Sequence, residues 1–258
     1  YTDATFTIGK DTYVKGETEL VKATNLNDSK HYKISIDSPS SSSDSYITAC
    51  FNPSSGSDVL TGTYVLAANA ALGTNNWQAE LQEFDNPGCG DGDDERASDN
   101  FSVVAPKPDL IAVKSHNPAG DVIEGQAFTW KIHIANTGTA SALFSNGQTI
   151  LIDNLPSSGA TYGAPAVVNA SGITGTINCS IAANNLSCVA SGAVNINAGG
   201  AFDVSFETTP TDNGSLKNPR NGGGMKCAVD PNDNILEVTG TNNSCAETVN
   251  VDEYPYTE

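Results

Sequence analysis

The sequence predicts an all-β protein built of tandem antiparallel β-sandwiches. Short segments in which apolar and polar residues alternate recur along the whole chain, and this is the period of a half-buried strand. Thr, Ser, Val and Asn are plentiful, and 24 Gly and 12 Pro punctuate the alternating segments. The segment 105–108 (APKP) reads as a stiff connection, and 258 residues suffice for two domains with separate cores.

The first domain is expected at residues 1–105. Its alternation begins at Phe6 and Ile8, and in residues 31–37 Tyr32, Ile34 and Ile36 share one face. Further strands are expected at residues 46–51, 62–68 and 77–84, and residues 100–106 (NFSVVAP) end the unit. About seven short strands in a unit of this length favour an Ig-like β-sandwich.

The second domain is expected at residues 106–251, with a C-terminal tail at residues 252–258. A strand at residues 109–115 opens it. In the clearest strand of the chain, residues 128–135, Phe128, Trp130 and Ile132 face one way. We then expect a strand at residues 148–155, a hairpin at residues 174–190 around an Asn-Asn turn, a strand at residues 200–210 and a closing hairpin at residues 227–251.

The cysteines indicate an oxidising compartment. No two of them form a Cys-x-x-Cys pair, which argues against a zinc ribbon or a redox motif. Sequence order suggests three local disulfides, each worth about 3 to 4 kcal/mol in the chain-entropy model, although other pairings and free thiols stay open. Disulfides imply a secreted or cell-surface protein. The suggested pairs are Cys50–Cys89, Cys179–Cys188 and Cys227–Cys245.

Charge and hydropathy exclude two kinds of partner. Lys and Arg number 12 against 30 Asp and Glu, so the formal net charge is −18 and both halves are acidic. Like charge makes nucleic acid an unlikely partner. We expect no membrane insertion, because no run of about 18 apolar residues occurs. The chain begins at Tyr1, which we interpret as a removed leader or an engineered start.

Residues 106–251 carry the pieces of a known domain type. They open with Pro108-Asp-Leu, contain a strand that ends in Asn136-Thr-Gly, and close with Asp230-Pro-x-x-Asn234-Ile-x-Glu237 before the pair Asn242-Asn243. This pattern resembles the cell-adhesion-related domain found in bacteria (CARDB). The middle of the segment is similar to the conserved repeat domain of bacterial and archaeal surface proteins.

The first domain resembles, more loosely, Ig-like surface repeats, through Tyr13, Gly16 and Glu17 and a later Gly73-x-x-x-Trp77. These resemblances imply exported, non-enzymatic sandwiches such as stalks, adhesins and filament subunits. The residues themselves give no sign of an enzyme, because the sequence contains neither a Gly-x-Ser-x-Gly elbow nor a pair of His residues with the spacing of metal ligands. We therefore expect a structural protein that self-associates into a surface filament. The alternative is a soluble adhesin that binds surface glycans, and a secreted hydrolase is a third possibility.

Two acidic segments raise the question of a cation. Asp230, Asn232, Asn234 and Glu237 are compatible with Ca²⁺, but Asp, Pro and Asn also form turns, and turn chemistry is favoured, with Glu237 bonding backbone near Asn242. The loop around Cys89 is the better candidate, since a divalent ion would relieve the repulsion among its carboxylates, although a solvated acidic loop is favoured there too. The proposed ligands are Asp91, Asp93, Asp94 and Glu95, and we expect no other cofactor.

Surface modification and assembly also leave signals. N-x-S/T sequons permit glycosylation at Asn27, Asn100, Asn169, Asn178, Asn185, Asn213 and Asn242, a number close to chance for this composition. Tyrosines near the ends suit docking on a neighbouring subunit, because Tyr offers contact area at little entropic cost. The candidates are Tyr1, Tyr254 and Tyr256.

Overall fold

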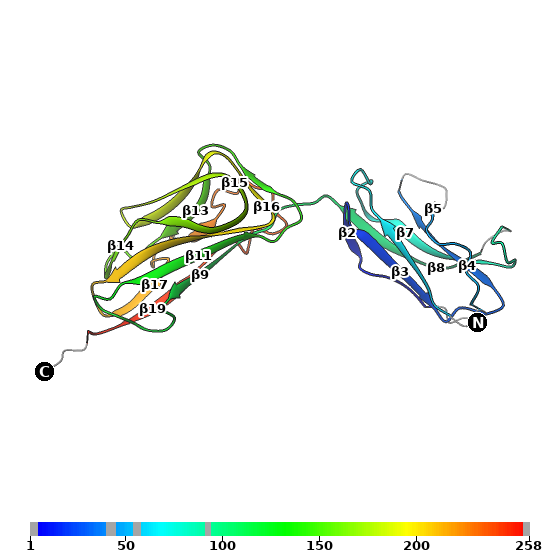
Figure 1. Ribbon diagram of the computed structural model, residues 1–258, viewed down its shortest axis with the longest axis horizontal. Coiled ribbons are helices and arrows are strands. Elements are labelled where there is room, and N and C mark those ends of the chain that lie inside the picture. Colours follow the sequence, from blue (N-terminus) through cyan, green and yellow to red (C-terminus); the bar gives the residue numbers. More distant parts are fainter. Residues whose placement is uncertain (1–4, 40–44, 54–57, 91–93, 255–258) are drawn as a thin grey trace. The chain divides into compact units, whose positions relative to one another are not determined.

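The computed structural model is all-β and describes residues 5–39, 45–53, 58–90 and 94–254 (Figure 1). Contacts divide the chain into two compact units, Tyr1–Pro106 and Lys107–Glu258. The dividing point falls inside the proline-containing segment at residues 105–108. Within the described ranges, no helix is present that could cross a membrane.

The first unit is a β-sandwich of a three-stranded and a five-stranded sheet. The orders are β1-β3-β6 and β2-β8-β7-β4-β5. Trp77, Phe101 and Tyr13 pack between the sheets, with the Trp77 and Phe101 ring centroids 5.8 Å apart. The strands are β1 (Thr5–Ile8), β2 (Thr12–Val14), β3 (Thr18–Thr24), β4 (His31–Asp37), β5 (Ser45–Tyr46), β6 (Leu60–Val65), β7 (Gly73–Phe84) and β8 (Asp94–Val104).

Two details of the first unit differ from the prediction. The strand expected at residues 46–51 is reduced to β5, because Thr48 Oγ1 accepts the Ile34 N–H at 2.9 Å in place of a backbone carbonyl. Regular pairing resumes only at the isolated bridge between Tyr32 and Phe51. In addition, β2 pairs parallel to β8, so the sandwich is not purely antiparallel.

The second unit is also a β-sandwich, with a three-stranded sheet β10-β19-β17 facing a larger sheet of eight strands. The main path of the larger sheet is β18-β13-β16-β11-β9. Its strands are β9 (Leu110–Asn117), β11 (Phe128–Asn136), β12 (Ala142–Phe144), β13 (Thr149–Asn154), β14 (Ala160–Tyr162), β15 (Ala166–Ala182), β16 (Asn185–Pro210) and β18 (Cys227–Val229); the smaller sheet has β10 (Val122–Ile123), β17 (Gly214–Asn218) and β19 (Glu247–Asp252).

Strand β16 organises the larger sheet. It runs beside β15 along the length of the unit, as Figure 1 shows, and pairs with β13 near its start and with β11 near its end. The hairpin expected at residues 174–190 and the strand expected at residues 200–210 are therefore parts of one longer hairpin. Its turn is Ala183-Asn184, both at positive φ, and Asn185 already belongs to β16.

The Asn-Thr-Gly motif ties the start of the second unit to the end of β11. Buried Asn136 donates to the carbonyl oxygens of Ala140 and Ile196 at 2.8 and 2.9 Å, and its Oδ1 accepts the Asp109 N–H at 3.0 Å. Gly138 is required two residues later, because a Cβ there would lie 2.4 Å from backbone atoms of Lys107 and Asp109.

The closing segment forms the predicted hairpin only at its base, where residues 227–229 are bridged antiparallel to residues 243–245 and the Val229 N–H donates to the Asn243 carbonyl at 2.9 Å. Strand β18 pairs with β13 in the larger sheet, whereas β19 pairs antiparallel with β17 and parallel with β10 in the smaller one. Residues 230–243 between them form turns and irregular chain. The segment crosses from one sheet to the other, and the tail expected at residue 252 begins one residue later, since β19 includes Asp252.

Candidate functional site

The disulfides lie within the units, and the structure joins Cys50 to Cys89, Cys179 to Cys188 and Cys227 to Cys245. The second links paired residues of β15 and β16. The third holds the crossing segment against β18, where the Cys245 N–H donates to the Cys227 carbonyl at 2.9 Å.

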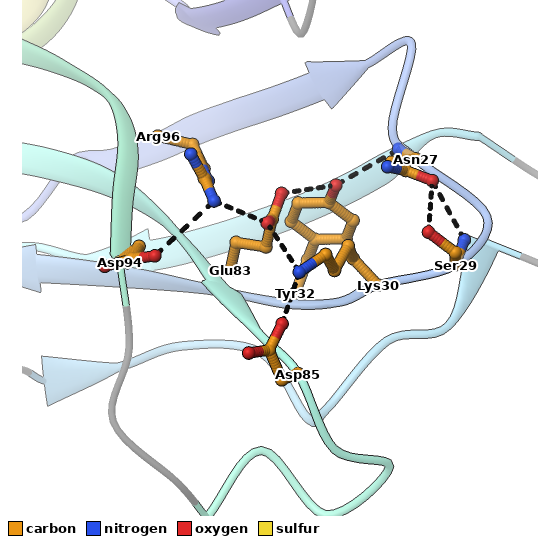
Figure 2. A network of polar contacts seen from close by, with 8 residues as sticks. All are labelled: Asn27, Ser29, Lys30, Tyr32, Glu83, Asp85, Asp94 and Arg96. Carbon is orange, nitrogen blue, oxygen red and sulfur yellow. Dashed lines mark hydrogen bonds and ion pairs between the residues drawn. The ribbon is translucent and has the colours of Figure 1, made fainter. Parts of the chain in front are cut away.

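A polar network covers one end of the first unit (Figure 2). At its centre is Glu83 of β7, whose side chain is 10% exposed. Glu83 Oε1 accepts from Arg96 Nη2 at 2.7 Å and lies 3.6 Å from Lys30 Nζ, while Oε2 accepts from Tyr32 Oη at 2.9 Å. Lys30 also pairs with Asp85. The two cations thus neutralise carboxylates that flank the acidic loop.

The Tyr32 hydroxyl links this network to the turn before β4. It accepts the Asn27 N–H at 3.1 Å, and Asn27 Oδ1 in turn accepts from the backbone and hydroxyl of Ser29. Burial, reinforced by the neighbouring Glu83 carboxylate, raises the pKa of Tyr32 to about 12. The hydroxyl therefore stays protonated and acts as a fixed donor, which makes the network structural.

The proposed cation ligands are only partly visible. Asp91 and Asp93 lie outside the described residues. Asp94 lies 3.5 Å from Arg96 at the start of β8, and Glu95 stands opposite Gln82 on β7. Among the described residues, no three His, Cys, Asp or Glu side chains gather as a metal site would require. The Ca²⁺ hypothesis therefore depends on the loop residues that the structure leaves out.

The contacts of Asp230 are those of a turn. Its carboxylate is 1% exposed and accepts the N–H groups of Asn234 at 3.0 Å and Ile235 at 2.8 Å. Asp230 itself has a positive φ of 41°, which Asp tolerates better than most residues. Both carboxylate oxygens are used by the chain, as the turn interpretation requires.

Glu237 bonds farther away than we expected. Its Oε2 accepts the N–H of Leu110, on the opening strand β9, at 2.5 Å, and its Oε1 accepts from the Asn243 side chain at 2.8 Å. Asn242 donates to Asp109 at 3.1 Å. The motif that closes the domain therefore fastens the crossing segment to the first residues of the domain, in addition to the contact with Asn243 in the same segment.

The seven sequons differ in how free their side-chain amides are. The Nδ2 groups of Asn169, Asn185, Asn213 and Asn242 donate hydrogen bonds, for example from Asn169 to Asp203 at 2.8 Å. Asn27 uses its carbonyl oxygen in the turn described above. Asn100 and Asn178 are exposed, and within the described residues their side chains make no hydrogen bond, so these two amides are the most accessible to a modifying enzyme.

Of the three tyrosines proposed for assembly, the structure describes only Tyr254, which is 51% exposed. Tyr1 and Tyr256 lie outside the described residues. Next to Tyr254, Glu253 accepts from Asn213 at 2.8 Å, which is an exposed and weak attachment.

Each unit has a shallow polar hollow. The hollow of the first unit has a volume of about 440 Å³ and is lined by Asp11, Asn75, Ser98, Asp99 and Asn100. That of the second unit has a volume of about 320 Å³ and is lined in part by Ser157, Ser158, Lys217 and Arg220. Hydroxyl, amide and charged groups at an open surface suit a polar ligand better than an apolar one.

Three buried ionisable side chains were missed by the sequence reasoning. Glu19, on the inner face of β3, is fully buried and neither carboxylate oxygen has a hydrogen-bond partner among the described residues. Lys114 of β9 and Asp153 of β13 form an ion pair of 2.8 Å with both side chains fully buried. The signal was present, because each residue occupies an inward position of its alternating strand.

No family model matches the sequence, and no curated protein matches it. Solved structures with some likeness include the CARDB domain of the PF1109 protein from Pyrococcus furiosus, in complex with di-metal ions. That domain is 18% identical, with a TM-score of 0.33, over 57% of this chain and 90% of the domain. It is of the family that residues 106–251 resemble.

Two bacterial surface proteins show a similar degree of likeness. The C-terminal domain of the Streptococcus agalactiae AgI/II polypeptide BspA is 11% identical, with a TM-score of 0.34, over 93% of this chain and 94% of that one. Collagen adhesin from S. aureus is 12% identical, with a TM-score of 0.31, over 97% and 93% of the two chains. At these identities and TM-scores the likenesses carry no argument about function.

Proposed function

We propose that the chain is a non-enzymatic extracellular structural protein that associates with copies of itself into a filament or similar surface structure. The three disulfides support an oxidising, extracellular location. The CARDB-like pattern of residues 106–251 agrees with a role at the cell surface. Two residues of that pattern, Asn136 and Glu237, make hydrogen bonds that stabilise the fold.

The open edge of the sheet β1-β3-β6 carries this proposal. Strand β6 ends the sheet, so one row of its backbone N–H and C=O groups has no partner strand within the described structure. Val65 on β6 is 65% exposed, and Leu20 on the neighbouring strand β3 is 54% exposed on the same outer face. A free strand edge beside exposed apolar side chains is a template for pairing with another chain.

The edge can be tested with a charge. We expect Val65→Lys to abolish assembly, because a lysine on a strand edge opposes pairing between sheets. Leu72→Lys is the matched control, since Leu72 is 53% exposed but lies outside any strand. Electron microscopy and light scattering measure the polymers. Equal assembly by both variants, or monomeric wild-type protein at all concentrations, would refute the role of the edge.

Tyr254 and Tyr256 are tested separately by ending the chain after Asp252, which keeps β19 intact. If the tail joins subunits, this truncation prevents assembly, and normal filaments without the tail would refute that role. Repeating light scattering with a chelator tests whether a divalent cation bound at Asp91, Asp93, Asp94 and Glu95 contributes. Loss of assembly on chelation, with recovery on adding Ca²⁺, is the expected result for a cation-bridged polymer.

The polar hollow lined by Asp99 and Asn100 favours a second candidate, a soluble module that binds surface glycans. This function predicts a monomer that is retained on a glycan array. It also predicts that Asn75→Ala, which removes an amide from the hollow, abolishes retention, whereas a change in the hollow of the second unit does not. Failure of the wild-type monomer to bind any glycan on the array would refute it.

A further inference from the structure

Lys114 and Asp153 meet in the interior of the second unit. Lys114 lies on β9 and Asp153 on β13, and β11 and β16 separate these strands in the order of the sheet. The two side chains therefore do not meet as neighbours on paired strands. Lys114 Nζ nevertheless lies 2.8 Å from Asp153 Oδ2, with both side chains 0% exposed.

The surroundings are poorly suited to an ion pair. Lys114 Nζ lies 5.8 Å from the centre of the buried Trp130 ring. Asp153 Oδ2 accepts one further hydrogen bond, from Asn218 Nδ2 at 3.1 Å. Asp153 Oδ1 is buried and has no hydrogen-bond partner within the described residues. A carboxylate ion ordinarily needs more donors than this when it is removed from water.

Burial moves both groups toward their uncharged forms. Removal from solvent lowers the pKa of Lys114 to about 8, even though the charges of Asp153 and Glu247 act in the opposite direction. Removal from solvent likewise raises the pKa of Asp153, against the effects of Lys114, Asn218 and Arg220, which lower it. A neutral amine is a nucleophile, and a protonated carboxyl group can lose water, so the environment favours the reactive form of each partner.

We propose that Lys114 and Asp153 condense to an intramolecular isopeptide bond that joins β9 to β13 through the core. A proton passes from Nζ to the carboxylate. The neutral amine then attacks Cγ, the Cγ–Nζ bond forms, and the bond between Cγ and Oδ1 breaks. Oδ1 leaves as water, with the carboxyl proton and one amine proton, and one proton stays on the amide nitrogen. No oxidant or further reactant is needed.

The geometry supports each part of this step. The two groups are held in contact by the fold, which replaces a bimolecular encounter by an intramolecular one. Asn218 donates to Oδ2, the oxygen that stays as the amide carbonyl, so this donor is in place before and after the reaction. Oδ1, the oxygen that leaves, is the one without a partner. The amide removes two charges from the apolar core and leaves an uncharged group there.

The intact mass of the wild-type chain, measured after reduction and unfolding, tests the proposal without any variant. We expect a mass lower than the sequence mass by one water molecule. Proteolysis and tandem mass spectrometry should then locate the loss in a branched peptide that contains both Lys114 and Asp153. The full sequence mass would overturn the proposal. Loss of one ammonia, together with a branched peptide that joins Lys114 to Asn218, would overturn the assignment to Asp153.

Two substitutions supply the matched control. Lys114→Met removes the amine but keeps an unbranched apolar chain, and should restore the full sequence mass. Lys131→Met changes an exposed lysine on the adjacent strand β11, and should retain the loss of water. Loss of water in the Lys114→Met protein would place the reaction elsewhere and overturn the proposal. The mass is read after unfolding, so the result does not depend on how stable either variant is.

Discussion

Replacing Glu19 by Gln should make the stability of the first unit much less sensitive to pH. Glu19 is 0% exposed, and its carboxylate oxygens have no hydrogen-bond partner among the described residues. Burial, with a smaller contribution from the charge of Asp99, raises the pKa of Glu19 from 4.5 to about 7. The folded state therefore binds the proton more tightly than the unfolded state does.

The sign and size of the effect follow from this difference. Below about pH 4.5 the group is protonated in both states, and its contribution to stability is fully present. The contribution is lost as the pH rises from 4.5 toward 7, where the folded state must ionise as well. At about 1.4 kcal/mol per pKa unit, the difference between 4.5 and about 7 makes the loss at most about 3.5 kcal/mol. The neutral Glu19→Gln protein escapes this loss, so it should exceed the wild type in stability at pH 8 but not at pH 4.5.

Urea unfolding at these two pH values measures the effect. Both proteins carry Trp130→Phe, so that Trp77 in the core of the first unit is the remaining one of the two tryptophans. Glu95→Gln is the matched control, because Glu95 is exposed on β8 of the same unit. A difference between Glu19→Gln and wild type that is equal at both pH values would show that Glu19 does not titrate as argued.

Three further sets of variants test contacts in the fold. Glu237→Ala should destabilise the second unit by about 1 to 3 kcal/mol, because the buried Leu110 N–H loses its acceptor. Glu237→Gln keeps an acceptor and should destabilise the unit less. Urea unfolding followed by Trp130 fluorescence measures both, and equal losses of stability would contradict this reasoning. Gly138→Ala should lower the stability of the second unit by about 1 to 3 kcal/mol, because the added Cβ clashes with Lys107 and Asp109. Gly240→Ala should be nearly neutral in the same measurement, because open space surrounds Gly240. Equal losses of stability in the two variants would contradict this reasoning. Removing Cys50–Cys89 should cost about 4 kcal/mol, since its loop spans 39 residues, whereas removing Cys179–Cys188, whose loop spans 9 residues, should cost about 2.5 kcal/mol, less than the general expectation of about 3 to 4. Calorimetry of the two double Ala variants measures both losses, and a larger loss for the shorter loop would contradict this.

Local sequence signals located most of the strands. Strand β11 was predicted almost to the residue, because its inward residues are large and strictly alternating, from Phe128 to Ile134. The prediction of two separate strands around Gly199-Gly200 was wrong, because the long β15 pairs along β16 on both sides of those glycines. The closing hairpin was predicted correctly only at its base: residues 227–229 pair antiparallel with residues 243–245, but β19 continues into the other sheet, where it pairs with β17.

For the polar residues too, contacts between neighbours in the chain could be predicted and contacts between distant residues could not. The turn chemistry of Asp230 could be read from its neighbours in the chain, since its carboxylate serves N–H groups four and five residues later. The partners of Glu237 and Glu83 could not, because Leu110 and Lys30 lie far away in the sequence. The acidic loop was a candidate cation site for which a solvated loop was favoured, and no signal in the sequence indicated that Lys30 and Arg96 pair with the carboxylates beside it.

By itself, the sequence determined the strand-rich class, the division into two units and the turns, because each depends on residues within a few positions of one another. Only the tertiary structure decided which strands pair across a sheet and which charged groups are buried together. The alternation of each strand can indicate that Lys114 and Asp153 point inward, but not that they meet. Their contact arises because β9 and β13 pack their inner faces into one core, and no local pattern records the distance between two strands.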